Sequence, residues 1–213
     1  MTNLHQSDKP AIGLDLNKLT HAFDFDPVFT AQSCTIAPGA ECLIRGHNGS
    51  GKSTLGKILA GELTPSHGSV VWSQAHHAIP FEDLAMLAYR VSPATALHPD
   101  LNIDELVAFQ TQFRSWRNGL DPMDWLQKGG LQSHRKRMYS ELSSGMQQRV
   151  KLSLALTSDA GLVVLDEPCA NLDEAGTQWY RHLLQEIKGK ATLVICSNDR
   201  EADFIAPESS VSL

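Results

Sequence analysis

The apolar residues of this chain gather in short continuous runs that alternate with stretches of helical spacing. The runs at 41–45, 162–165 and 192–196 are largely apolar, which is typical of strands buried on both faces of a parallel sheet. Residues 175–188 place apolar side chains three or four positions apart, which predicts a helix between the last two runs. Strands that alternate with helices in this way predict an α/β fold with a mostly parallel sheet.

Two regions depart from this alternation. Residues 14–39 and 68–72 read as short strands and turns, with Pro27 as one of the breaks, and they predict a small antiparallel β subdomain. From about residue 102 to 158 the spacing of apolar side chains is mainly helical. Because strand patterns resume afterwards, we expect an inserted helical lobe at about residues 92–158.

Two further expectations concern element ends. Apolar residues between 55 and 63 follow helical spacing, and Pro65 is expected to end this helix. Near the end of the sequence we expect a short helix around Glu201, followed by a last strand around residues 210–213.

Composition narrows the class of protein. The chain has 213 residues, of which 42% are hydrophobic, and this suits a single α/β domain spanning residues 1–213. The formal net charge of -6 argues against a nucleic-acid partner, because duplex binders need a basic face. No apolar run approaches the about 20 residues of a membrane helix, and residues 1–15 lack a signal-peptide core, so we expect a cytoplasmic protein.

The most informative stretch is Gly-His-Asn-Gly-Ser-Gly-Lys-Ser-Thr at 46–54. It matches G-x-x-x-x-G-K-[ST], the phosphate-binding loop of P-loop nucleoside triphosphatases. Glycines let the backbone approach phosphate oxygens, Lys52 supplies positive charge to the β- and γ-phosphates, and the Ser53 hydroxyl can bind Mg²⁺. The expected nucleotide-binding residues here are Gly46, His47, Asn48, Gly49, Ser50, Gly51, Lys52, Ser53 and Thr54.

An acidic pair follows the apolar run at 162–165. Asp166 ends the expected strand, where a carboxylate can hold the Mg²⁺ shared with Ser53. Glu167 would then lie beside the γ-phosphate, where it can orient or deprotonate the attacking water. The alternative is a pair of exposed acids that cap a strand, which the four apolar residues directly before the pair disfavour.

A third motif carries a family resemblance. The stretch Leu-Ser-Ser-Gly-Met-Gln-Gln-Arg at 142–149 resembles the Leu-Ser-Gly-Gly-Gln signature of ABC (ATP-binding cassette) ATPases. The order of the phosphate loop, this signature, Leu-Asp-Glu-Pro at 165–168 and Asn-Leu-Asp at 171–173 matches the family along essentially the whole chain. The resemblance implies ATP and Mg²⁺ as cofactors. It also implies head-to-tail pairing with a second ABC ATPase subunit, expected here as a homodimer.

The resemblance further implies roles for single residues. Ser143 and Gly145, at the start of an expected helix, would contact the γ-phosphate held by the partner's phosphate loop. Asp173, in the family's D-loop, is expected in the same nucleotide site. An aromatic residue upstream of the phosphate loop stacks on adenine in this family; Phe23 is the first choice and Phe25 the second, and a core role suits either residue equally well.

Several positions depart from the family pattern. Ser144 and Met146 replace the usual glycine and glutamine of the signature, and near Ser92 or Pro93 a glutamine that contacts Mg²⁺ is missing. Asn198 stands where the family has a histidine that contacts the γ-phosphate, and we include it among the catalytic residues. Because an amide cannot carry positive charge, the loss of a charge-assisted bond, about 1.5–3 kcal/mol, predicts slow hydrolysis.

The resemblance implies an ATP-binding and ATP-hydrolysing subunit that powers an ABC transporter by dimer closure. Transmembrane permease subunits would hold it at the inner face of the membrane, with the lobe at about residues 92–137 as the docking surface. Two alternatives stay open: a soluble ABC ATPase switch outside transport, and a degenerate cassette that binds ATP with little turnover. The short chain resembles the small cassettes of haem export in cytochrome c maturation.

Overall fold

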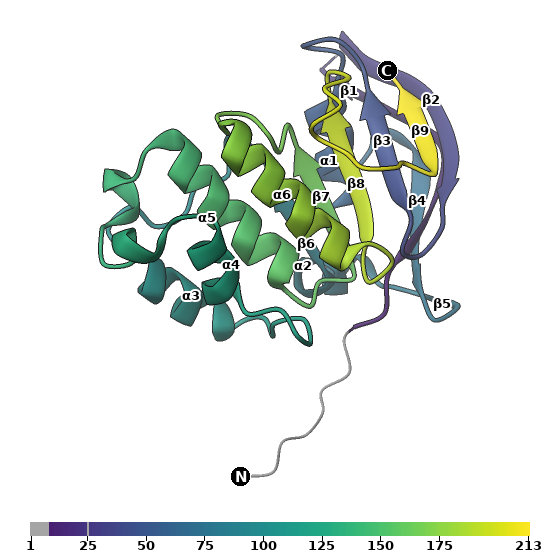
Figure 1. Ribbon diagram of the computed structural model, residues 1–213. Helices are drawn as coiled ribbons and strands as arrows, with labels where there is room; N and C mark the ends of the chain where they lie inside the picture. Colours follow the sequence, from purple (N-terminus) through teal and green to yellow (C-terminus); the bar gives the residue numbers. More distant parts are fainter. Residues whose placement is uncertain (1–8, 25) are drawn as a thin grey trace.

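The computed structural model describes residues 9–24 and 26–213 (Figure 1). Its strands are β1 (Gly13–Phe23), β2 (Asp26–Ile36), β3 (Glu41–Arg45), β4 (His67–Gln74), β5 (His77–Ala78), β6 (Ala88–Val91), β7 (Leu162–Asp166), β8 (Thr192–Ser197) and β9 (Ser209–Ser212). Its α-helices are α1 (Lys52–Leu59), α2 (Leu84–Leu87), α3 (Ile103–Thr111), α4 (Pro122–Lys128), α5 (Ser144–Thr157) and α6 (Glu174–Ile187). Short 3-10 turns lie at 81–83, 132–134 and 139–141.

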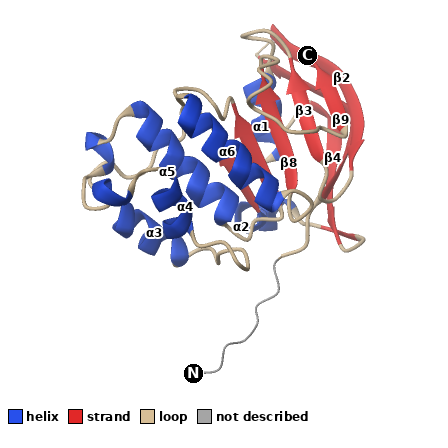
Figure 2. Cartoon of the chain, in the orientation of Figure 1, coloured by secondary structure: helices blue, strands red, loops and turns tan. Residues whose placement is uncertain are grey.

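The strands form two sheets within the described residues. The parallel sheet has the order β6-β7-β8-β3-β9, and the antiparallel sheet has the order β2-β1-β4-β5. Figure 2 shows the strands gathered in one part of the molecule and most of the helices in the other. The α/β fold class expected from the sequence, with a parallel core and a small antiparallel sheet, is therefore confirmed.

Both faces of the parallel sheet are covered, which explains its continuous apolar strands. On one face, Ile44, Val164 and Val194 pack in a core that includes Leu55 of α1 and residues of the antiparallel sheet. On the other face, side chains of β3, β7 and β8 pack with α5 and α6. A strand that is buried on both faces shows no alternation of polar and apolar residues, so short apolar runs are enough to predict strands of this kind.

The helices α3, α4 and α5 share a core of their own. It contains Ile103, Leu106, Leu126, Leu131, Tyr139, Leu142, Val150 and Leu154. Helix α3 begins with a capping box, in which Asn102 Oδ1 accepts from the Glu105 N–H at 3.1 Å and Glu105 Oε2 accepts from the Asn102 N–H at 2.8 Å. In the part of the chain that the structure describes, no helix is long and apolar enough to cross a membrane.

The antiparallel strands are longer than the sequence predicts. Strands β1 and β2 have 11 residues each, and Pro27 lies inside β2 instead of breaking it. Strand β2 is at the end of the sheet order, where the missing N–H of a proline costs no ladder bond. The prediction that Pro27 separates short strands is therefore wrong.

Helix α1 is shorter than predicted. It ends at Leu59, because Gly61 adopts a left-handed φ of 76° and closes a terminal motif. In this motif the Gly61 N–H donates to Ile58 O at 3.0 Å and the Glu62 N–H donates to Lys57 O at 2.8 Å. The glycine therefore ends the helix four residues before the proline to which the sequence analysis assigned that role.

The short helix expected around Glu201 is also wrong. Residues 199–206 form turns and bends, and side chains from α6 bind their backbone carbonyls. Arg181 donates from one terminal nitrogen to Glu201 O and Phe204 O, both at 2.8 Å, and the Tyr180 hydroxyl donates to Asp203 O at 2.7 Å. Tertiary contacts thus satisfy the groups that a helix would have paired.

Candidate nucleotide-binding site

Loops that follow three parallel strands meet at one edge of the sheet. Arg45 at the end of β3 pairs with Ser197 at the end of β8, and Asp166 at the end of β7 pairs with Cys196. The segments after these strands therefore leave the sheet at the same level, at the edge where α/β proteins bind ligands. They carry the phosphate loop, Glu167 and the residue that follows Ser197.

The phosphate loop turns directly into α1 through glycine. Gly51 is the N-cap of α1 with a φ of 98°, and a Cβ at this position would lie 2.6 Å from Val28 Cγ1. Gly49 also has positive φ, at 83°, and faces open space. The Ser50 hydroxyl is buried and has no hydrogen-bond partner among the described residues. With the free N–H groups of the first turn of α1, this hydroxyl forms a polar cradle that suits phosphate oxygens.

The side chain of Lys52 is held inside this loop. Lys52 is only 5% exposed, and its Nζ donates to Gly46 O at 2.7 Å and to His47 O at 2.9 Å. Lys52 Nζ also donates to Asn198 Oδ1, from the loop after β8. The ammonium has three donors, and these acceptors match them, so the charge is fixed in place beside the cradle.

Asn198 also connects the loop to Glu167. Its Nδ2 donates to Asn48 Oδ1 at 2.5 Å and to Glu167 Oε1 at 3.2 Å. The three residues predicted as catalytic, Lys52, Glu167 and Asn198, therefore form one hydrogen-bonded chain. Sequence reasoning placed them in the same site, and the structure brings their side chains together.

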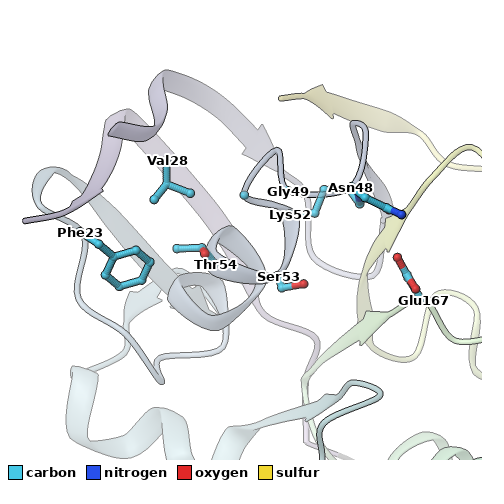
Figure 3. A pocket seen from close by; sticks show the side chains of 9 residues that line it. Phe23, Val28, Asn48, Gly49, Lys52, Ser53, Thr54 and Glu167 are labelled. Carbon is cyan, nitrogen blue, oxygen red and sulfur yellow. The ribbon is translucent and has the colours of Figure 1, made fainter. Parts of the chain in front are cut away.

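Glu167 has an uncommon backbone conformation. Its φ is 46°, in the left-handed region that non-glycine residues rarely adopt. The Glu167 N–H donates to Cys196 O at 2.9 Å, and Glu167 O accepts from the Ala170 N–H at 2.9 Å. Such strain persists where surrounding contacts enforce it, and it is frequent at functional sites. The turn places the carboxylate at the same end of the pocket as Asn48, as Figure 3 shows.

These side chains border an open pocket of about 470 Å³, within the size range of small-molecule sites. Its lining residues are Phe23, Val28, Asn48, Gly49, Gly51, Lys52, Ser53, Thr54 and Glu167. In Figure 3, Thr54 and Ser53 lie between the apolar pair Phe23 and Val28 and the polar group that includes Glu167. The pocket therefore has an apolar end and a phosphate-binding end.

Phe23 lies at the apolar end, as the adenine-stacking prediction requires. Phe23 is 55% exposed, and its ring meets His21 edge to face, with ring centroids 4.7 Å apart. Val28 also lines this end, and sequence reasoning missed it because a valine in an expected strand looks like any core residue. The second candidate, Phe25, lies outside the described residues.

The two residues predicted to bind Mg²⁺ differ in their relation to the pocket. Ser53 lies exposed in the first turn of α1 and lines the pocket, whereas Asp166 is 5% exposed at the end of β7 and does not line it. Within residues 9–24 and 26–213, no cluster of three or more His, Cys, Asp or Glu side chains could hold a metal alone. A hydroxyl and a carboxylate suit Mg²⁺, which keeps water and phosphate oxygens as its other ligands.

The signature residues and Asp173 do not line this pocket. Ser143 is the N-cap of α5, where its hydroxyl accepts from the Met146 N–H at 3.3 Å. A Cβ on Gly145 would lie 2.7 Å from Asn171 O, so close backbone packing already requires glycine there. Asp173 caps α6 through the Gly176 N–H; this bond and the nearby Arg149 lower the pKa of the Asp173 carboxyl.

Ser92 and Pro93, where the family's glutamine is missing, are bonded to a side chain of α5. Ser92 is 3% exposed, and its N–H donates to Thr95 Oγ1 at 2.9 Å. Lys151 Nζ reaches both Ser92 O and Pro93 O at 3.3 Å, and burial lowers the pKa of this lysine. These bonds tie α5, the helix that contains most of the signature, directly to the segment after β6.

The fold and this pocket define a P-loop nucleoside triphosphatase. Residues 29–170 match the model of the ABC transporter family, which covers more than half of the chain. The chain belongs to that family, and it is an ATP-binding and ATP-hydrolysing subunit of an ABC transporter.

Similar proteins of bacterial export systems support this family. The cytochrome c biogenesis ATP-binding export protein CcmA of Xylella fastidiosa (strain 9a5c) is 32% identical over 171 residues, which cover 80% of this chain and 76% of that protein. The Nod factor export ATP-binding protein I of Rhizobium meliloti (strain 1021) is 29% identical over 209 residues, which cover 92% of this chain and 60% of that protein.

Solved structures support the fold. A putative ABC transporter ATP-binding protein from Pyrococcus furiosus has a TM-score of 0.78 at 22% identity, and the match covers 94% of this chain and 97% of that chain. The dimeric ATP-binding cassette MJ0796, in a post-hydrolysis state with ADP and Pi, has a TM-score of 0.74 at 21% identity, over 89% of this chain and 90% of that chain.

The apolar end of the pocket yields a test of nucleotide affinity. Stacking on an aromatic ring contributes about 1–3 kcal/mol per base, so Phe23→Ala should weaken ATP binding at least about five-fold. Phe23→Trp keeps a π-face and should bind ATP as the wild type does. Calorimetric titration with Mg-ATP measures both. Phe113→Ala removes an equally exposed phenylalanine elsewhere and serves as the control; unchanged affinity in Phe23→Ala would contradict the assignment.

Proposed function

We propose that this chain binds Mg-ATP in the pocket around Lys52 and hydrolyses it with Glu167 acting on the attacking water. The observation that carries this proposal is the hydrogen-bonded chain from Lys52 through Asn198 to Glu167. It places a fixed positive charge, a neutral amide and a carboxylate around one side of a cradle of free N–H groups. Phosphoryl transfer needs positioning and charge stabilisation of this kind.

Each residue has a defined part in the reaction. Lys52 and the first turn of α1 bind and orient the β- and γ-phosphates. Ser53 and Asp166 would hold Mg²⁺, which when bound supplies positive charge to the phosphate oxygens. Glu167 accepts the proton of the attacking water, and Asn198 keeps its carboxylate in place. Because Asn198 adds no positive charge at the γ-phosphate, we also propose that ATP hydrolysis is slow.

A second copy of the chain would complete the site. Ser143 and Gly145 lie at the N-terminus of α5, a helix of 14 residues, and outside the pocket of their own chain. In a head-to-tail homodimer, the N–H groups at this end of α5 would face the γ-phosphate bound by the other copy, with Asp173 nearby. The dimeric state of the structural relative MJ0796 supports this arrangement. Each copy would be a single ABC ATPase domain over residues 1–213, with the helical lobe at about 92–158.

Membrane-embedded permease subunits would couple this cycle to transport from the inner face of the membrane. A groove of about 380 Å³ borders the lobe, next to the segment that Lys151 ties to α5. Its lining residues are Ala60, Gly61, Glu62, Ala85, Ala88, Tyr89, Arg90, Thr95, Ala96, Leu97, Gln110 and Arg114. The small side chains leave room for a partner, and the similarity to cytochrome c biogenesis ATP-binding export proteins favours an export system of that class.

The groove can be tested by filling it. Ala96→Arg places a long side chain at its lining, so we expect the permease to be lost from affinity-purified protein while Mg-ATP affinity stays unchanged. Ala94→Arg is the matched control, because Ala94 is exposed nearby and does not line the groove. Quantitative mass spectrometry of proteins that co-purify from solubilised membranes measures the effect. Equal recovery of the permease with both variants would refute this docking surface.

The chemistry is tested by Glu167→Gln. A general base contributes about 10²–10⁴-fold, so phosphate release should fall at least about 100-fold. ATP binding should remain, since glutamine keeps an oxygen for the Asn198 amide, and dimers should accumulate with Mg-ATP in size-exclusion chromatography. Glu186→Gln, an exposed change on α6, should leave turnover unchanged. Wild-type turnover in Glu167→Gln would rule out this role of the carboxylate.

A further inference from the structure

A buried carboxylate lies between the two loops that carry Glu167 and Asn198, and the reaction described above does not use it. Asp203 is 3% exposed. Its Oδ2 accepts from the Ser197 hydroxyl at 2.6 Å, and its Oδ1 accepts from the Cys169 N–H at 3.1 Å. One side chain thus bonds to both loops at once.

The bonded atoms are close to the catalytic residues in sequence. Ser197 directly precedes Asn198, and Cys169 follows Glu167 by two positions. Arg200 adds one bond between the same loops, because its guanidinium donates to Cys169 O at 2.9 Å, and its N–H donates to Ser197 Oγ at 3.1 Å within the loop after β8.

The backbone of Asp203 is itself bonded to helix α6. Its carbonyl accepts from the Tyr180 hydroxyl at 2.7 Å, and Tyr180 is fully buried in α6. A small pocket of about 170 Å³ lies beside these groups. Its lining residues are Glu167, Ala170, Asn198, Arg200 and Asp203. Asp203 therefore joins the packed helix layer to the catalytic loops.

We propose that Asp203 is a positioning residue that clamps the loop after β7 to the loop after β8, so that the Asn198 amide stays within hydrogen-bond reach of Glu167. This inference rests on the proposed function. Both carboxylate oxygens already accept bonds from the two loops, so Asp203 acts through geometry and touches no reacting atom. Misplacement of a catalytic group by about 1 Å can cost up to about 100-fold in rate, so the clamp has a measurable effect on turnover.

Alanine and asparagine at position 203 separate geometry from charge. Asp203→Ala removes both bonds, and we expect kcat to fall about ten-fold with KM for ATP changed less than about two-fold. Asp203→Asn keeps an oxygen for the Cys169 N–H and an NH₂ group that can donate to Ser197 Oγ, so kcat should stay within about three-fold of wild type. If asparagine lowers kcat as far as alanine does, the side chain acts through its charge and the clamp is refuted.

A double-mutant cycle with Asn198→Ala tests the route of the effect. In the Asn198→Ala background there is no amide for the clamp to position against Glu167. Adding Asp203→Ala to this background should therefore lower kcat by less than about two-fold further. A merely structural role would lower kcat by the same factor in both backgrounds, which would overturn the proposal. Ser197→Ala removes only one bond and keeps the cycle possible if Asp203→Ala does not fold; it should show a smaller loss of kcat with the same non-additivity.

A control variant and the activity of the wild type distinguish failure of the positioning role from failure of the proposed function. Glu201→Ala removes an exposed acid from the same loop and should leave kcat and the melting temperature unchanged. If Glu167→Gln abolishes phosphate release while the Asp203 and Asn198 effects multiply, the positioning role fails and the proposed function stands. If the wild-type chain releases no phosphate from Mg-ATP, the proposed function fails and the positioning role fails with it.

Discussion

The site depends on the register of three parallel strands. Because β3, β7 and β8 end at the same level, the chain must turn away from the sheet three times at one edge. Each turn delivers one chemical component: the phosphate loop, the acidic pair and the amide of Asn198. Close packing on both faces of the sheet fixes this register, since a slip by one residue would exchange the side chains that fit against each face. The chemistry is therefore set by packing far from the pocket.

Lys52 shows how the loop holds a charge ready before a nucleotide arrives. Two backbone carbonyls and the Asn198 amide oxygen accept its three donors, so a largely buried ammonium is satisfied within the chain. A phosphate oxygen that binds Lys52 exchanges with one of these acceptors. Asn198 is the acceptor on a side chain, and its NH₂ group already faces Glu167. Exchange at this residue would couple nucleotide binding to the position of the carboxylate.

Local motifs could be predicted from the sequence, and tertiary contacts could not. The phosphate loop, Asp166 and Glu167 were found because their chemistry is encoded in adjacent residues after an apolar run. The prediction of a helix around Glu201 was wrong because Arg181 and Tyr180 bind the backbone of this segment, and the local spacing of apolar residues carries no sign of these contacts. The end of α1 was missed because the αL conformation of one glycine outweighed the apolar spacing beyond it.

The signature residues illustrate a different limit. The resemblance to the family assigned Ser143, Gly145 and Asp173 to a nucleotide, whereas a single chain shows helix caps and close packing at these positions. Both roles are compatible, because a helix N-terminus that is capped by a side chain still presents other free N–H groups. Val28 was missed for the opposite reason: an ordinary strand residue became part of the pocket only through the fold.

The central claim is that a triphosphate binds against the backbone amides and the ammonium of one loop. The most direct measurement is the Mg²⁺-dependent affinity of the purified chain for ATP, compared between the wild type and Lys52→Ala. The account predicts binding by the wild type that needs Mg²⁺ and weakens at least about ten-fold without the ammonium, as the loss of a charge-assisted bond requires. Equal affinity of both proteins for ATP, with or without Mg²⁺, would contradict it.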